Sequence, residues 1–382
     1  MLSLIIFMFI LCILFGIHIL YPVILKSLLR NPRSLRPLKI TGKTSQIDLP
    51  LVTIIIPVYN EEPVIERRIN NILESKYPKD RLEIFIIDSG STDKTRTIIR
   101  SKFQGVVTLL TEEDRRGKAH AINLALPKSN GALVILTDGA TLYNNRTILH
   151  LVNTFSDNTI GAVSALYDVP NREASYVTGS EHKFWLHKDS IRILESKVHS
   201  TSWLSGEACA FRNGIVSKID EDTLADDSNV ALQVISKGYR SVVNEEAHFT
   251  ESSPTETVDY FMVKSRRALG GLIETLRFKR LLFSSRSGYF GMVIFPYRFF
   301  VYVFSPILSC LAAVLAILTS WEMISHIGIY PVLVIGVIFA AIFLIVRDKM
   351  MIYFYTQLFT ITALLWLIVG NVDVRWSKSK TR

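Results

Sequence analysis

Cysteine is scarce in this sequence, and two common nucleotide-binding signatures are missing. The 382 residues include three cysteines, Cys12, Cys209 and Cys310, and no metal-ligand spacing connects them. This excludes a disulfide scaffold, so the catalytic part either lies in a reducing compartment or needs no disulfide. No G-x-G-x-x-G follows the apolar run at 52–58, and no G-x-x-x-x-G-K-[ST] occurs. Their absence disfavours a dinucleotide-binding fold and a P-loop enzyme.

Acidic residues are absent from residues 26–43, which hold six Lys and Arg. The net charge is +9, yet residues 44–290 hold 30 basic and 31 acidic side chains. The basic excess therefore flanks the apolar ends of the chain. A nucleic-acid-binding protein would concentrate that excess on its folded domain, so we expect no nucleic-acid partner. The pattern instead favours contact with lipid headgroups and a cytoplasmic central domain.

The first 25 residues lack charge and predict a membrane anchor. No charged side chain occurs from Leu2 to Leu25, and a helix of this length crosses a ~30 Å hydrocarbon core. A cleaved signal peptide is the alternative, but it needs a basic start, a shorter apolar run and a small-residue cleavage site. We therefore expect an anchor at 1–25, followed by a basic juxtamembrane linker at 26–49.

A second apolar zone, at 295–370, predicts two or three further spans in a multi-pass protein of the cell membrane. The candidate segments are 297–319, 328–346 and 351–370. Three spans would place the C-terminus outside, whereas the basic tail at 371–382 favours the inside. The topology stays open, because one segment can instead be shallow or interfacial. Residues 255–294 mix basic and apolar side chains, which is typical of interfacial amphipathic helices.

Residues 50–254 alternate short β-branched runs with amphipathic stretches, and this predicts an α/β domain. Strands are expected at 52–58, 82–87, 106–110 and 133–137. Such alternation is typical of an open, mostly parallel sheet with helices on both faces. Ligands then bind beyond the carboxyl ends of the strands.

Carboxylates follow three of these strands. Glu61 comes after the first strand, Asp88 after the second and Asp138 after the fourth. Three such groups in one crevice favour a nucleotide together with a divalent cation. The alternative is that each one only caps the next helix.

In their order along the chain, three motifs resemble those of the family 2 glycosyltransferases, which have a GT-A fold. Residues 52–61 look like the family's first strand and nucleotide-contacting turn, and residues 86–93 like its base- and ribose-binding segment. Residues 116–123 resemble the glycine loop near the diphosphate. The donor-binding residues that this resemblance implies are Pro57, Tyr59, Glu61, Asp88, Gly117, Lys118 and Asp138.

The resemblance also implies a Mg²⁺ or Mn²⁺ site, in a degenerate form. Asp138 lies where the family has its D-x-D motif, but the second acid is replaced by Ala140. One carboxylate, the diphosphate and a further ligand can still hold such an ion. The resemblance offers His248 as that ligand, and a surface or packed histidine is the alternative.

The catalytic base is expected in the segment that ends at Asp227. Residues 224–227 are similar to the family's acidic base motif, with Asp227 as the base and Asp226 either raising its pKa or capping the helix. A base is needed because a sugar hydroxyl is a poor nucleophile until it loses its proton. Upstream, the resemblance places Trp203, Gly206 and Glu207 on the acceptor side, although Trp203 can equally be packing.

The family's Q-x-x-R-W motif is only partly present. Arg267 matches its Arg, while Lys264 replaces the Gln and Ala268 the Trp. We expect Arg267 to contact the donor diphosphate, since a guanidinium matches two phosphate oxygens. Headgroup contact is the alternative, and the missing Trp makes processive synthesis less secure.

Together these features predict an inverting glycosyltransferase. Its donor would be a nucleotide-diphosphate sugar, with UDP favoured, and its acceptor a polysaccharide or lipid-linked glycan in the bilayer. Two alternatives stay open: a lipid-phosphate sugar synthase on the same fold, and a non-catalytic membrane assembly module. The sequence does not indicate an oligomeric state.

Overall fold

The computed structural model describes residues 2–30, 49–330, 333–334, 336–337, 347–370 and 372. Most of the linker expected at 26–49, most of the segment expected at 328–346 and nearly all of the tail at 371–382 lie outside the described residues.

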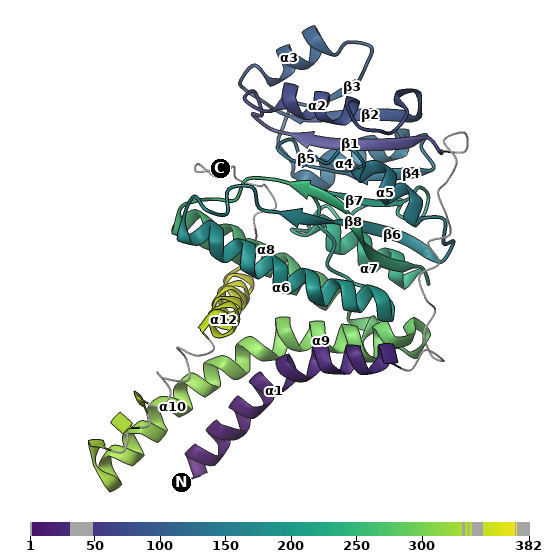
Figure 1. Ribbon diagram of the computed structural model, residues 1–382. Helices are drawn as coiled ribbons and strands as arrows, with labels where there is room; N and C mark the ends of the chain where they lie inside the picture. The colour runs from purple at the N-terminus through teal and green to yellow at the C-terminus, as the bar shows by residue number, and fades with distance from the viewer. Residues whose placement is uncertain are drawn as a thin grey trace.

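An eight-stranded mixed sheet forms the core of the domain and is flanked by helices on both faces (Figure 1). The strands follow the order β3-β2-β1-β4-β7-β6-β8-β5, and the pairs β4–β7, β6–β7 and β5–β8 are antiparallel. The remaining pairs are parallel. The predicted fold class, a mostly parallel α/β sheet with apolar helices at both ends of the chain, is therefore confirmed. The strands are β1 (Val52–Val58), β2 (Leu82–Ser89), β3 (Thr108–Glu112), β4 (Leu133–Leu136), β5 (Leu142–Tyr143), β6 (Ile160–Asp168), β7 (Cys209–Arg212) and β8 (Arg240–Thr250).

Every residue of β1 is buried, because both faces of this central strand are covered. On one face Ile54 and Ile56 belong to the cluster formed with α2 (Ile65–Leu73), α3 (Thr95–Lys102) and α5 (Thr147–Thr154). On the other face Ile55 packs with α4 (Lys118–Ala125) and α7 (Asp226–Ser236). Each fully buried isoleucine contributes about 1.5–3 kcal/mol of hydrophobic free energy to folding. The strand that leads to the turn with Tyr59 and Glu61 is therefore firmly packed.

The third strand differs from the prediction at 106–110, since β3 begins two residues later, at Thr108. Gly105 has a φ of 78°, and the backbone N–H groups of Val106 and Val107 donate to the carbonyl of Phe103. The chain is therefore still turning out of α3 at these valines, and local turn geometry overrides their β propensity.

Two long helices, α6 (Tyr176–Val198) and α8 (Thr257–Arg277), lie between the sheet and the apolar helices (Figure 1). The apolar helices are α1 (Leu2–Arg30), α10 (Ser305–Ile327) and α12 (Arg347–Val369). A π-helical turn (Phe290–Ile294), α9 (Phe295–Phe299) and a second π-helical turn (Phe300–Phe304) lead into α10.

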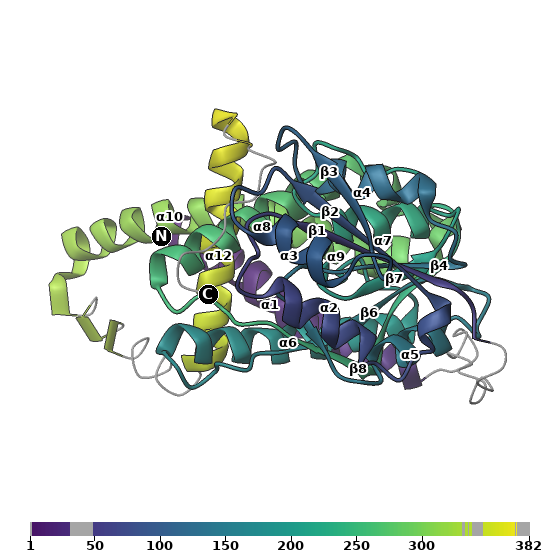
Figure 2. The ribbon, with the colours of Figure 1, turned by 90° about the horizontal axis from the view of Figure 1, so that it is seen from above.

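Three helical segments are long and apolar enough to cross a membrane: Leu2–Arg30, Phe290–His326 and Met351–Val369. Side chains of α1 and α10 pack together, while others such as Phe9, Ile19, Ile317 and Trp321 are exposed. Exposed apolar surface of this kind suits a lipid environment. Figure 2 shows α12 running across α10 and α1 rather than alongside them. The number of spans and the topology stay predictions.

Candidate active site

The turns after β1 and β2 are joined into one structure at the edge of the sheet. The side-chain oxygen of Asn60 accepts from the backbone N–H of Thr92 at 2.8 Å. The backbone N–H of Asn60 donates to Ser91 Oγ, also at 2.8 Å. Asn60 has a φ of 54°, a left-handed conformation that asparagine tolerates. Pro57 is the second-last residue of β1, and the ring of Tyr59 lies under the guanidinium of Arg115, 4.0 Å from ring centroid to Cζ. The predicted donor turn is thus held by hydrogen bonds to the next strand end.

Asp88 is fully buried near the end of β2. One carboxylate oxygen pairs with Arg96 and accepts from the backbone N–H of Ser91 at 3.2 Å. The other oxygen, Oδ1, has no hydrogen-bond partner among the described residues. A buried acceptor without a partner is costly, which is consistent with the predicted role of Asp88 in binding a nucleoside hydroxyl or base N–H.

Lys118 links two of the predicted site carboxylates. It is the first residue of α4, directly after Gly117, whose φ of 107° favours glycine. Its ammonium lies 2.8 Å from Asp138 Oδ1 and 3.2 Å from Asp226 Oδ2. Burial opposes the charge, but Asp138 and Asp226 outweigh it and raise the pKa of Lys118 well above its usual range. Lys118 is therefore a fixed positive charge.

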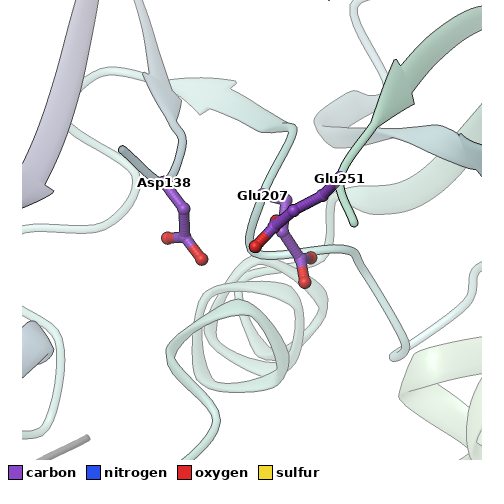
Figure 3. A group of neighbouring side chains, drawn as sticks. All are labelled: Asp138, Glu207 and Glu251. Carbon is purple, nitrogen blue, oxygen red and sulfur yellow. The ribbon is translucent and has the colours of Figure 1, made fainter. Parts of the chain in front are cut away.

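Figure 3 shows three carboxylates that point toward one another from different segments. Asp138 follows β4, Glu207 lies before β7 and Glu251 follows β8, and one oxygen from each lies within 4.8 Å of the others. Glu207 also accepts from Arg267 at 2.9 Å, and Glu251 from Thr141 at 3.0 Å. Oxygen donors in such a group suit Mg²⁺ or Mn²⁺. The residues present therefore fit the predicted divalent cation, with Glu207 and Glu251 in place of the missing second acid of the D-x-D motif.

His248 does not belong to this carboxylate group. Its Nδ1 lies 3.0 Å from Asp168 Oδ2 and its Nε2 lies 3.1 Å from the carbonyl of Glu245. On β8 the neighbouring Phe249 is buried in the core while His248 is partly exposed, so the two side chains point to opposite faces of the sheet. The structure thus favours the alternative of a surface histidine, and the metal ligand proposed for this segment becomes Glu251.

Asp226 and Asp227 are the first two residues of α7, where the helix dipole stabilises negative charge. Burial, together with the nearby negative charges of Asp226 and Glu207, raises the pKa of Asp227 to about 6, although the hydrogen bond from the Ser228 N–H acts in the opposite direction. That bond is 2.7 Å long. A carboxylate with this pKa is a better proton acceptor near neutral pH than an ordinary aspartate.

Lys264 and Arg267, at the Gln and Arg positions of the partial Q-x-x-R-W segment, have different partners. Arg267 pairs with Glu207 of the carboxylate group at 2.9 Å, so its guanidinium lies beside the expected diphosphate position. Lys264 is buried and pairs with Glu181 of α6 at 2.6 Å. The lysine that replaces the Gln therefore joins α8 to α6.

A cavity of about 1150 Å³ connects these groups to the apolar helices. Its lining includes Lys118, Asp138, Glu207 and the Asp226–Asp227 pair at one end. Gly206 is close-packed there, since a Cβ on it would lie 3.3 Å from Lys118 Nζ. Trp203 lines the same cavity and makes an edge contact with Tyr302, with ring centroids 6.5 Å apart. The cavity continues along residues of α1, α9 and α12.

Comparison with known proteins agrees with this geometry. The profile described as "Glycosyl transferase family 2" matches residues 53–220. The Probable glycosyltransferase YdaM of Bacillus subtilis (strain 168) is 25% identical over 280 residues, covering 69% of this chain and 65% of the relative. A Beta-monoglucosyldiacylglycerol synthase of Nostoc sp. is 31% identical over 140 residues, covering 36% of this chain and 30% of the relative. The matched region thus spans less than two thirds of either relative.

One solved structure resembles nearly the whole chain. It is the "Mannosyltransferase PcManGT from Pyrobaculum calidifontis in complex with GDP-Man and Mn2+", with a TM-score of 0.76 and 26% identity. The similarity covers 97% of this chain and 99% of that chain, so it includes apolar helices as well as the sheet. Together with the profile match and the sheet order, this shows that the chain carries a family 2 glycosyl transferase domain with a GT-A fold.

Proposed function

We propose that this protein is an inverting glycosyltransferase that moves a sugar from a nucleotide-diphosphate donor to a hydroxyl of a lipid-linked or polysaccharide acceptor at the membrane. The observation that carries the proposal is the cavity, which places Asp227 near the carboxylate group and opens toward helices apolar enough to span a bilayer. We further propose that the domain faces the cytoplasm, because the segment after α1 is basic.

In this mechanism Asp227 accepts the proton of the acceptor hydroxyl as that oxygen attacks the anomeric carbon. Attack from the face opposite the leaving group inverts the configuration in a single displacement. Lys118 and Arg267 neutralise the charge that develops on the diphosphate, because both are fixed beside the carboxylate group. The chemistry that Mg²⁺ or Mn²⁺ supplies when bound by Asp138, Glu207 and Glu251 is further stabilisation of that charge.

The nucleotide of the donor is best settled by direct comparison. The sequence favours a UDP-sugar, whereas the similar mannosyltransferase structure holds GDP-Man. We propose to measure release of the nucleoside diphosphate by the full-length protein in lipid nanodiscs. UDP-glucose, UDP-N-acetylglucosamine and GDP-mannose are offered separately as donors with Mn²⁺. One donor is expected to give turnover that requires a lipid or glycan acceptor.

Asp227→Asn is the matched control, since it keeps the shape of the side chain and removes its basicity. Turnover should fall by roughly 10²-fold or more, as for loss of a positioned general base, while nucleotide binding measured by calorimetry stays unchanged. Near-normal turnover in Asp227→Asn would reject the assignment of the base. Absence of release with every donor would count against the proposed function itself.

A further inference from the structure

The cavity of the candidate site has an apolar end formed by membrane-type helices. His18, Ile19 and Pro22 of α1 line it, as do Tyr353 and Thr356 of α12. Both helices belong to the segments apolar enough to cross a membrane. A molecule that fills the whole cavity therefore needs a hydrocarbon part at this end and a polar part near Asp227.

One further cation of this cavity is Lys188. It lies on α6 and is half-buried, with its ammonium 4.6 Å from the ring centroid of Trp185, 5.8 Å from Trp203 and 6.0 Å from Phe184. Among the described residues, no carboxylate lies within ion-pair distance of Lys188. By contrast, Lys118, Lys264 and Arg267 each pair with a carboxylate at 3.2 Å or less.

The charge of Lys188 is therefore incompletely compensated. Burial, together with the neighbouring cations Arg192 and Lys264, lowers the pKa of Lys188 to about 7, while Asp227 acts in the opposite direction. A half-buried ammonium in this position gains from an anion, because the lowered local dielectric strengthens the pairing. The aromatic rings around it supply apolar faces for the rest of the ligand.

We propose that Lys188 binds the phosphate group of a lipid-linked acceptor whose hydrocarbon chain lies against α1 and α12. This inference rests on the proposed function and specifies its acceptor class. The donor diphosphate has its own cations, since Lys118 and Arg267 lie at the carboxylate group. Lys188 therefore distinguishes acceptors that carry a phosphate near the reacting group from neutral glycolipids.

A binding experiment tests this assignment without any need for turnover. The probes are dodecyl phosphate, dodecyl glucoside and inorganic phosphate, added to the full-length protein in nanodiscs and followed by tryptophan fluorescence, since Trp185 and Trp203 flank Lys188. Lys188→Met should raise the dissociation constant of dodecyl phosphate about 10- to 100-fold, which is the loss expected for one charge-assisted hydrogen bond. Binding of dodecyl glucoside should change less than about twofold.

Two control variants sharpen the comparison. Lys188→Arg keeps the charge and should retain most of the phosphate preference, whereas Lys183→Met removes an exposed lysine of the same helix and should have no effect. Equal weakening of both dodecyl probes in Lys188→Met, or no weakening, would overturn the proposal. Inorganic phosphate binding as tightly as dodecyl phosphate would overturn the lipid part and leave only a free-phosphate site.

A transfer experiment separates failure of this inference from failure of the proposed function. A polyprenyl-phosphate-linked monosaccharide and an alkyl glycoside of the same sugar are offered with the active donor. Lys188→Met should raise KM for the phosphate-linked acceptor alone, about 10- to 100-fold, with KM for the donor unchanged. Equal changes for both acceptors would overturn the role of Lys188. If the wild-type protein transfers to neither acceptor, the proposed function fails, and the binding experiment still decides the role of Lys188.

Discussion

At the scale of single residues, the environment of Asp227 makes activity depend on pH. Because burial, followed by Asp226 and Glu207, raises the pKa of Asp227 to about 6, the base is deprotonated above that pH and inactive below it. We expect kcat/KM to rise with pH through about 6 and then to level off. Asp226→Asn removes one neighbouring negative charge, so its acid limb should move to lower pH. A pH–rate profile that is flat from pH 5 to 7 would contradict this role for Asp227.

The carboxylate group gives a second prediction at this scale. Glu251→Gln keeps the size of the side chain but removes one negative ligand, so the Mn²⁺ concentration for half-maximal activity should rise by about 10-fold or more. His248→Ala is the matched comparison, because His248 of β8 contacts Asp168 of β6 rather than the carboxylate group, and it should leave the metal titration unchanged. A shift with His248→Ala and none with Glu251→Gln would restore the histidine as a ligand.

Sequence reasoning reached some of these residues and missed others for a physical reason. Asp138 and Asp227 follow motifs with local signatures, so they could be identified from their neighbours. Glu251 comes into the site only because β8 pairs with β6 and β5, a contact between segments about 80 to 110 residues apart. The one available signal was that a glutamate directly follows a strand, and a lone strand-end acid is weak evidence.

At the scale of elements, the strands with continuous apolar runs were predictable and the long-range pairings were not. β1 matches its prediction at both ends, and β2 begins at the expected residue. The antiparallel insertion of β7 between β4 and β6 depends on a chain reversal that no local pattern in the sequence specifies. Helix α6 likewise lines the cavity because of where it packs, so Lys188 could not be singled out from the sequence alone.

The contact between α6 and α8 includes a buried ion pair, Lys264 with Glu181. Burial opposes ionisation of Glu181, but Lys264 and Arg267 outweigh it and lower its pKa. Lys264→Met leaves that carboxylate buried without its cationic partner, although Trp185 and Tyr260 still donate hydrogen bonds to it, and should destabilise the fold by up to about 3–5 kcal/mol. Thermal unfolding in detergent should show a lower Tm for this variant, and Lys264→Met combined with Glu181→Met should recover most of the loss. No recovery in the double variant would show that the pair is not the cause.

At the scale of the whole molecule, one arginine connects the apolar segment to the catalytic helix. Arg298 of α9 is buried, and its guanidinium donates to Thr275 Oγ1 of α8 at 2.9 Å and to Ser202 Oγ at 2.9 Å. It also reaches Ser228 Oγ, the residue after Asp227, at 3.4 Å. The packing supports this link, since a Cβ on Gly271 of α8 would lie only 2.4 Å from Tyr302 Cζ. The apolar segment that leads into α10 is therefore hydrogen-bonded to the start of α7, where the proposed base lies.

This connection predicts that a substitution at Arg298 lowers turnover without changing the affinity for the nucleotide. Arg298→Met removes the hydrogen bonds to Thr275, Ser202 and Ser228. Hydrogen bonds to a charged group contribute ~1.5–3 kcal/mol, so their loss should loosen the start of α7. We therefore expect kcat to fall by about 10- to 100-fold. The nucleotide dissociation constant, measured by calorimetry, should stay within about twofold, since the turns after β1 and β2 are held by their own hydrogen bonds. Arg280→Met, which removes an exposed arginine just after α8, is the control and should leave kcat unchanged. A parallel loss of nucleotide binding in Arg298→Met would mean general unfolding, whereas unchanged kcat would mean that the membrane segment anchors the domain without positioning its base.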